Sequence, residues 1–275
     1  MRLLGIFLAS LPLSAVFVHD SSSLRYLWMA SLLVNLGAIW GIVNVIRGRG
    51  GVAYLKAYLR KDASANEDYF CVFREGLFKV LPSPASRAIV FLGDSLTSSC
   101  EWHEMFSNDL TILNRGIGGD TSPGVLKRIS TVSDLRPLAV FLMIGTNDAQ
   151  LLGYDPADTL RNYRLIVQNL RQSSRDTRIP DTRIYVQSIL PSRAPKFNHW
   201  SAEVNRGIRQ LAEEEGVTFV DLRPAFMDSN RTLSERLTID GLHLNAEGYL
   251  LWKRQIDPLV QEVVGAESSR ELRTR

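Results

Sequence analysis

The chain has 275 residues, of which 45% are hydrophobic and 22% are charged, and its net charge is +3 at pH 7. These values are typical of a globular protein with a substantial core, and the small positive excess is too scattered for a nucleic-acid-binding face. We therefore expect no nucleic-acid partner. The four histidines lie in unrelated segments, and Cys71 and Cys100 are interpreted as thiols, with one bridge between them left open.

Two apolar stretches stand at the start of the chain. Leu3 to Val18 has 16 uncharged residues, and Tyr26 to Ile46 has 21. A helix needs about 20 apolar residues to cross a bilayer, so the second stretch is long enough and the first is borderline. The alternatives are a cleavable signal peptide for the first and a buried soluble helix for the second. We predict that residues 1–50 form a membrane anchor of one or two transmembrane helices.

Positive charge predicts the orientation of this anchor. The loop between the two stretches carries only Arg25, whereas the flank after the second is basic at Arg47, Arg49, Lys56, Arg60 and Lys61. Positive flanks stay on the cytoplasmic side, so the main domain is expected to face the cytoplasm. The alternative is the periplasmic or extracytoplasmic face, because large domains can cross a membrane despite their charges.

Residues 51–85 are predicted to form an amphipathic connector. Within it, apolar and aromatic residues recur at helical spacing: Tyr69, Phe70, Phe73, Leu77, Phe78 and Leu81. Such a stripe is typical of a packing face. Pro82 and Pro84 are expected to end the helix.

From residue 86 onward, short apolar runs alternate with helical patterns. Strands are predicted at 88–92, 111–113, 139–144, 183–190 and 217–221, and helices near 101–109, 122–132, 156–173, 200–215 and 246–264. Mostly apolar strands separated by helices indicate a parallel sheet covered on both faces. The fold class is therefore a three-layer α/β/α doubly wound sheet over residues 86–264, followed by a polar, frayed tail at 265–275. In such folds, ligands bind at the carboxyl ends of the strands.

Polar clusters follow three of these strands. The first, Gly93-Asp94-Ser95-Leu96, can expose a serine hydroxyl at a strand-to-helix turn, although Asp94 or Ser95 can also simply cap the helix. It is not a Gly-x-Ser-x-Gly elbow, because Thr97 stands where the second glycine belongs.

The second cluster, Asn114 to Thr121, is rich in glycine and suits backbone N–H groups aimed at an anion. It matches neither the dinucleotide fingerprint nor the P-loop. The third, Gly145-Thr146-Asn147-Asp148, offers an amide that can donate to a developing oxyanion. A plain turn or helix cap is the alternative for both clusters.

A fourth element lies just before the last helix, at Asp240-Gly-Leu-His243. An aspartate and a histidine three residues apart can share one turn, with the carboxylate orienting the imidazole toward a nucleophile. A lone histidine there is usually structural, but this one is joined to an aspartate in a chain with an exposed serine.

The four blocks, in this order, resemble the SGNH (GDSL-type) hydrolases from about residue 86 to 264, which have a flavodoxin-like fold. The motifs are similar to the branch of the platelet-activating-factor acetylhydrolase catalytic subunits and bacterial GDSL-type lipases. The resemblance implies a triad of Ser95, His243 and Asp240, with an oxyanion hole from the N–H groups of Ser95 and Gly119 and the Asn147 side chain. It implies no cofactor and no metal. Asp94, Asp120 and Asp148 are expected to hold turns by accepting backbone N–H bonds.

The expected function is therefore a serine esterase acting on acetyl or short acyl esters of lipids or carbohydrates. The alternatives are an acyltransferase with the same triad and an inactive membrane-tethered binding module. Phe197, His199 and Trp200, in a segment rich in loop residues, are predicted to border the substrate pocket, with surface packing as the alternative. We expect a membrane-anchored enzyme of a bacterial inner membrane.

Overall fold

The structure is a computed structural model that describes residues 31–32, 35–37, 39–40, 43–44, 69–81, 84, 87–106, 111–150, 155–172 and 182–274. The chain divides into two compact units, Met1–Asn66 and Glu67–Arg275. In the first unit, the described residues are helical and exposed. The second unit holds the sheet and every candidate site residue.

The expected membrane anchor needs correction. In the described part of the chain, no helix combines the length and the apolar character that crossing a bilayer requires. Leu3 to Val18 and most of Tyr26 to Ile46 lie outside the described residues. The predicted membrane-anchored location, with its cytoplasm-facing domain and its membrane contact, is therefore wrong.

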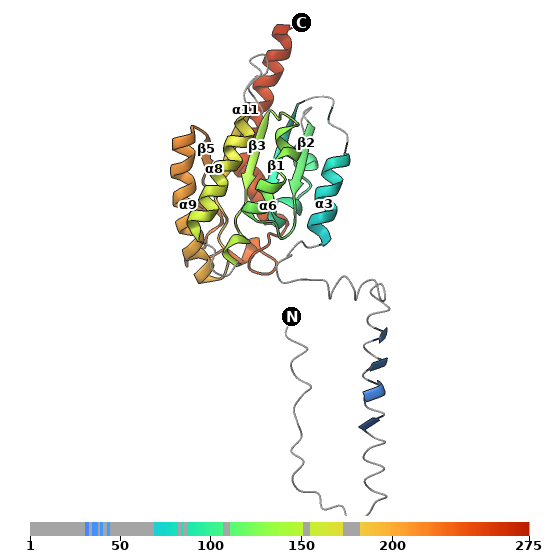
Figure 1. Cartoon of the computed structure of the whole chain (residues 1–275). Helices are drawn as coiled ribbons and strands as arrows, with labels where there is room; N and C mark the ends of the chain where they lie inside the picture. Colours follow the sequence, from blue (N-terminus) through green and yellow to red (C-terminus); the bar gives the residue numbers. More distant parts are fainter. Residues whose placement is uncertain are drawn as a thin grey trace, which may run out of the picture. The chain divides into compact units, whose positions relative to one another are not determined.

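The second unit is built on five parallel strands in the order β2-β1-β3-β4-β5 (Figure 1). The strands are β1 Ala88–Gly93, β2 Thr111–Gly116, β3 Ala139–Met143, β4 Arg183–Gln187 and β5 Thr218–Val220. Each lies where an apolar run predicted it. The chain places β2 on one side of β1 and then β3, β4 and β5 on the other, so the direction of winding reverses between β1 and β3. In doubly wound folds, ligands bind near this reversal, at the carboxyl ends of the strands. The predicted parallel α/β sheet is confirmed.

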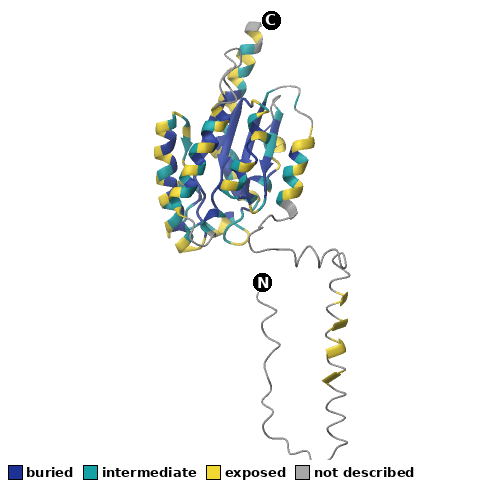
Figure 2. Cartoon of the chain, in the orientation of Figure 1, coloured by how far each residue is buried: buried dark blue, intermediate teal, exposed yellow. Residues whose placement is uncertain are grey.

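Burial explains why these runs form a central sheet. Every residue of β1 and β3 is buried, and the strands lie inside the helices in Figure 2. Successive side chains point to opposite faces. Phe91 and Phe141 enter one core, and Val90 and Val140 enter the other. An apolar strand without alternation is therefore stable only when helices cover both of its faces.

The helices form the two outer layers. They are α3 Tyr69–Val80, α4 Ser95–Ser98, α5 Trp102–Met105, α6 Ser122–Lys127, α7 Ser130–Ser133, α8 Pro156–Gln172, α9 Pro195–Glu215, α10 Arg223–Phe226 and α11 Ala246–Thr274, with short 3-10 turns at Asp148–Gln150 and Glu235–Leu237. Helices α6, α7, α8 and α9 supply the core that contains Val90. Helices α4, α5, α10 and α11 supply the core that contains Phe91.

Two helices differ from their predicted bounds. Helix α9 begins at Pro195, within the segment expected to be a loop. Proline suits the first helical turn because its φ is already helical. Its lack of an N–H costs nothing there, since the N–H groups of the first turn have no acceptor within the helix. Helix α11 continues to Thr274, through the predicted frayed tail. Residues 265–274 contain good helix formers, and Glu267 pairs with Arg270 one turn away.

Candidate active site

The four predicted blocks meet at the carboxyl edge of the sheet. Ser95 begins α4 directly after β1, Gly119 lies in the loop after β2, and Asn147 follows β3. Asp240 and His243 come from the turn before α11. Segments 148 residues apart in the sequence thus bring Ser95 and His243 together.

The turn that carries Ser95 is tightly packed. A Cβ atom at Gly93 would collide with the carbonyl oxygen of Met143 and with the Thr97 hydroxyl, so only glycine fits there. Asp94 caps α4 by accepting the Leu96 N–H at 3.0 Å and is fully buried. This leaves Ser95 as the first helical residue, half-buried at the rim of the sheet.

The predicted triad residues lie within hydrogen-bond distance of one another. Ser95 Oγ is 3.0 Å from His243 Nε2, and His243 Nδ1 is 2.7 Å from Asp240 Oδ2. Because a carboxylate only accepts, the network assigns the imidazole proton to Nδ1 and leaves Nε2 free to accept from the serine. This is the arrangement that a histidine base needs to activate a hydroxyl nucleophile.

Asp240 is held in its ionised form by local donors. The imidazole of His243 is the largest cause, and the backbone N–H groups of His243 and Leu242, at 2.7 and 3.0 Å, add to it. Together they lower the pKa of Asp240 to about 2. The side chain is about half exposed, at 52%. Hydrogen bonds rather than burial therefore fix this carboxylate.

The Asp240–His243 turn is shaped by backbone conformation and by one hydroxyl. Gly241 has φ +91°, a left-handed value that glycine adopts freely. The Thr238 hydroxyl accepts the Gly241 N–H at 2.9 Å and donates to the His243 carbonyl at 2.7 Å. The Arg193 N–H donates to the Gly241 carbonyl at 2.8 Å. The turn is therefore tied to the loop after β4.

The predicted oxyanion donors occupy two linked loops. Gly119 has φ +76° and is exposed. Asn147 donates one hydrogen of its side-chain amide to the Asp120 carbonyl at 2.7 Å. That bond fixes the plane of the amide next to Gly119 and leaves its second N–H for another acceptor. One amide hydrogen of Asn147 therefore has no assigned acceptor among the described residues.

Buried side chains tie these loops to the sheet. Arg128 is 2% exposed and contacts Asp120 Oδ2 at 2.8 Å and the Gly93 carbonyl at 3.2 Å, which joins the loops after β1 and β2. Asp148 accepts the Ser122 N–H at 2.8 Å, and Asp120 accepts the Thr121 N–H at 2.9 Å. With the Asp94 cap, all three aspartates accept backbone N–H bonds as expected. The long-range role of Arg128 was not foreseen.

Helix α3 also supports the loop after β2. Cys71 Sγ lies 3.3 Å from the Gly118 carbonyl, and Arg74 Nη2 lies 3.4 Å from the Gly116 carbonyl. Phe78 is buried, and its ring centroid lies 4.8 Å from the Arg74 guanidinium carbon and 4.7 Å from that of Arg115. These contacts are cation–π interactions. Of the predicted packing stripe, Phe78 is buried next to a candidate oxyanion donor, whereas Phe73 and Leu81 are exposed, so the stripe packs only in part.

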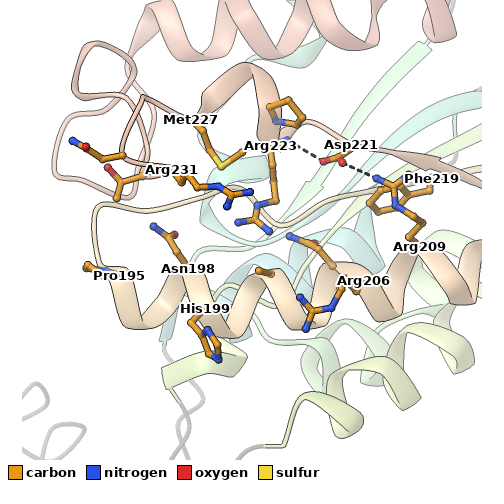
Figure 3. Close-up of a pocket in the computed structure, with 15 residues that line it drawn as sticks. Pro195, Asn198, His199, Arg206, Arg209, Phe219, Asp221, Arg223, Met227 and Arg231 are labelled. Carbon is orange, nitrogen blue, oxygen red and sulfur yellow. Dashed lines mark hydrogen bonds and ion pairs between the residues drawn. The ribbon is translucent and has the colours of Figure 1, made fainter.

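A cavity of about 460 Å³ opens beside Asp240. Phe197 and Trp200, which were predicted to border the substrate pocket, line it, and so do Thr146, Arg193, Lys196 and Leu242. Neither Ser95 nor His243 lines it, so the cavity lies on the Asp240 side of the triad. His199 faces elsewhere and lines a second cavity (Figure 3).

Asp94 has the most unusual ionisation next to the site. Burial raises its pKa to about 7, against the opposing effect of the Leu96 N–H. The Thr146 hydroxyl also lowers this pKa, although its geometry falls outside that of a hydrogen bond, and Asp94 Oδ2 has no partner among the described residues. Within the same part of the chain, no three side chains form a metal-binding group, so no metal ligands are assigned.

Comparisons with known proteins cover the part of the chain that holds this candidate site. The model of the GDSL-like Lipase/Acylhydrolase family matches residues 91–251. Platelet-activating factor acetylhydrolase IB subunit alpha1 of Bos taurus is 34% identical over 170 residues, covering 58% of this chain and 69% of that protein. A solved structure from Streptococcus pneumonia, provisionally described as a platelet activating factor, is 26% identical with a TM-score of 0.60 and covers 76% of this chain and 97% of its own. A GDSL-like lipase from Bacteroides thetaiotaomicron shares the fold at 21% identity and a TM-score of 0.58, over 70% of this chain and 97% of its own.

Proposed function

Because the chain belongs to the GDSL-like lipase/acylhydrolase family and is an ester-hydrolysing enzyme of that type, we propose that Ser95, His243 and Asp240 form its catalytic triad. The observation that carries the proposal is the continuous chain of contacts, 3.0 Å from Ser95 Oγ to His243 Nε2 and 2.7 Å from Nδ1 to Asp240. A non-enzymatic binding module does not agree with the family.

The proposed reaction has two acyl-transfer steps. His243 Nε2 takes the Ser95 proton as Oγ attacks the ester carbonyl, and the resulting imidazolium then protonates the departing alcohol. Water repeats the sequence on the acyl-enzyme and regenerates Ser95. Asp240 stays ionised throughout, because its pKa lies near 2, and it stabilises the imidazolium at Nδ1.

The oxyanion of each tetrahedral intermediate is proposed to bind the N–H groups of Ser95 and Gly119 and the free N–H of Asn147. Donors fixed before the reaction stabilise developing charge without reorganisation. The bond from Asn147 to the Asp120 carbonyl and the buried Asp120–Arg128 pair supply that rigidity.

The proposed substrates are acetyl or short acyl esters of lipids or carbohydrates. The acetylhydrolase relative supports the acetyl group, and the 460 Å³ cavity supports a compact alcohol or acyl portion. Phe197 and Trp200 offer an apolar wall, and Lys196 adds a positive charge at the same cavity, whereas Arg193 is paired with Asp228 and Glu235 at 3.5 and 3.3 Å. An ester with one apolar and one polar end matches this lining.

Labelling with a fluorescent fluorophosphonate tests the proposal, combined with turnover of aryl esters from acetate to long-chain acyl. The wild type should label and hydrolyse short esters, and Ser95→Ala should do neither. Ser268→Ala is the matched control, because this exposed residue of α11 donates its hydroxyl to the Val264 carbonyl one turn earlier.

Two outcomes would count against the triad: a Ser95→Ala variant that still labels, or a folded wild type that neither labels nor turns over an ester. Product analysis with an added alcohol acceptor separates hydrolysis from acyl transfer by the same triad.

A further inference from the structure

A second cavity, of about 630 Å³, lies on the other side of helix α9 from the candidate substrate cavity. Its walls come from α9, from the start of α10 and from the turn at residues 228–232 (Figure 3). Pro195 and His199 face it, whereas Lys196, Phe197 and Trp200 of the same helix face the substrate cavity. One helical segment thus separates two cavities, and no triad residue lines the second one.

Positive charge is concentrated in this cavity. It is lined by Arg206, Arg209, Arg223 and Arg231 and by one acidic residue, Asp221, which leaves a net charge of +3. Asp221 is already bound, to Arg209 at 2.7 Å and to the Arg223 N–H at 3.3 Å. The other three guanidinium groups have no acidic partner among the residues that the structure describes.

Two of these arginines lie close together, and the third is on α9. Figure 3 shows the Arg223 and Arg231 guanidinium groups next to each other, while Arg206 extends from α9 away from them; Arg206 and Arg231 are exposed, and Arg223 is half-buried. Arg223 Nε is buried with no hydrogen-bond acceptor in the described residues. Burial and the charges of Arg231 and Arg206 lower the pKa of Arg223, against the opposing effect of Asp221. Like charges held together without a counterion are unfavourable, and a bound anion would relieve that cost.

The turn that carries Arg231 is unusually constrained. Arg231 has φ +59°, a left-handed value that side chains other than glycine rarely adopt. Asp228 Oδ1 accepts the N–H groups of Asn230 and Thr232 at 2.9 and 3.0 Å, and the Asp228 carbonyl accepts the Arg231 N–H at 3.0 Å. The turn thus fixes the backbone of Arg231 at a conformational cost, as ligand-binding turns often do.

We propose that this arginine cavity, defined by Arg206, Arg223 and Arg231, is a binding site for the phosphate group of a phosphorylated small molecule, separate from the ester-cleaving site. Guanidinium groups bind phosphate oxygens through paired N–H bonds, and three of them match a dianion. The cavity is larger than one phosphate requires, so the ligand carries an organic part. Met227 and Phe219 provide apolar surface for it in the same cavity.

Isothermal titration calorimetry with inorganic pyrophosphate as the probe tests the site. The wild type should bind, and the affinity should fall as salt rises, because screening weakens partly exposed charges. Arg231→Gly and Arg206→Gln should each weaken binding by about tenfold, the usual value of a charge-assisted hydrogen bond. Arg231→Gly also relieves the left-handed φ, so a loss of affinity in it is not a loss of folding. Arg254→Gln, an exposed arginine of α11, is the matched control and should bind as the wild type does.

Two further arms identify the source of the phosphate. Soluble glycerol 3-phosphate is compared with sedimentation on phosphatidylcholine vesicles that contain phosphatidic acid. Arginine-dependent binding in one arm supports the proposal and assigns a soluble metabolite or a lipid headgroup, respectively. Binding that is absent in all arms, or unchanged in Arg231→Gly and Arg206→Gln, would overturn it. Ser95→Ala should bind the probe normally, so this site is tested independently of the triad.

Discussion

The two turns that supply the proposed triad are built in opposite ways. The Gly93–Ser95 turn is packed against Thr97 of the following helix and against Met143 and Arg128, which come from separate parts of the chain. The Asp240–His243 turn is half exposed and organised mainly by contacts within six residues. The proposed nucleophile is therefore positioned by the core of the fold, and the proposed base is positioned mainly by its own turn.

Each turn contains an aspartate, and their ionisation shows the same contrast. Burial raises the pKa of Asp94 to about 7, whereas hydrogen bonds lower that of Asp240 to about 2. The surroundings of Asp94 therefore disfavour its ionised form, whereas those of Asp240 favour it. The difference teaches that a carboxylate can serve as a structural cap in one turn and as a permanent charge in the next. Each role can be disturbed separately.

Loss of the Asp240 charge should have the largest effect. Asp240→Asn is expected to lower kcat by about 10⁴-fold, because an amide no longer fixes the imidazole tautomer or stabilises its charged form. The midpoint of thermal unfolding should change little, since the side chain is half exposed. Steady-state kinetics on an aryl acetate and a melting curve measure both effects. A variant that retains a tenth of the wild-type kcat would remove Asp240 from the triad.

Replacement of Asn147 should have the second-largest effect on activity. Asn147→Ala is expected to reduce kcat by about 10²- to 10³-fold with KM nearly unchanged, because one donor to the transition-state oxyanion is lost. The matched control is Asn169→Ala, an exposed asparagine of α8 whose amide contacts only the Leu165 carbonyl. Equal kcat values for the two variants would assign Asn147 a purely structural role.

The buried turn should show its effect in the pH dependence of stability. A raised pKa means that the folded state holds the Asp94 proton more tightly, so stability should fall as pH rises from about 4 to 7 and stay level above that range. The slope is at most about 1.4 kcal/mol per pH unit. Asp94→Asn cannot titrate, so urea unfolding at pH 5 and pH 8 should show a smaller loss in this variant. Burial also raises the pKa of Asp120, which contributes to the pH dependence of both proteins. The effect of Asp94 is therefore measured as the difference between the wild-type and Asp94→Asn profiles. Parallel profiles would contradict the assignment.

A strained substitution in the exposed Asp240–His243 turn should lower the free energy of unfolding only moderately. Gly241→Ala places a Cβ atom 3.3 Å from that of Arg193, which is tight but not impossible, and forces alanine to φ +91°. We expect a destabilisation of about 1–2 kcal/mol, measured by urea unfolding. Gly265→Ala, in α11 with open space around it, should instead stabilise by about 0.5–1 kcal/mol. If both changes have the same sign, the strain argument fails.

The sheet could be predicted from sequence because its signal is local. In runs such as Ala88-Ile-Val-Phe-Leu92, apolar residues follow one another and do not alternate with polar ones. This pattern suits a strand that is covered on both faces, and all five strands lie where apolar runs occur. The ends of helices were less predictable. Pro195 was taken for a loop residue, although it occupies the first turn of α9. A proline fits both contexts, and its neighbours did not distinguish them.

The candidate site was predictable where residues lie together in a motif. Ser95, Asn147, Asp240 and His243 each belong to a short block. Arg128 was missed because its partners, Asp120 and Gly93, are joined to it only by folding. The arginine cavity was missed for the same reason, since Arg206, Arg223 and Arg231 come from three different elements. Contacts across elements have no local pattern to reveal them.

Helix α3 extends the folding unit of this enzyme beyond the span that the family model matches. Tyr69–Val80 lies before the family-matched span of residues 91–251, yet it contacts the carbonyls of Gly116 and Gly118 beside the proposed oxyanion donor Gly119. Its buried Phe78 also offsets the mutual repulsion of Arg74, Arg115 and Arg128. A chain begun at β1 would retain every side chain of the proposed triad and still expose that arginine cluster to water. The family-matched span and the folding unit therefore have different boundaries, and the loop of the proposed oxyanion donor Gly119 contacts residues of both.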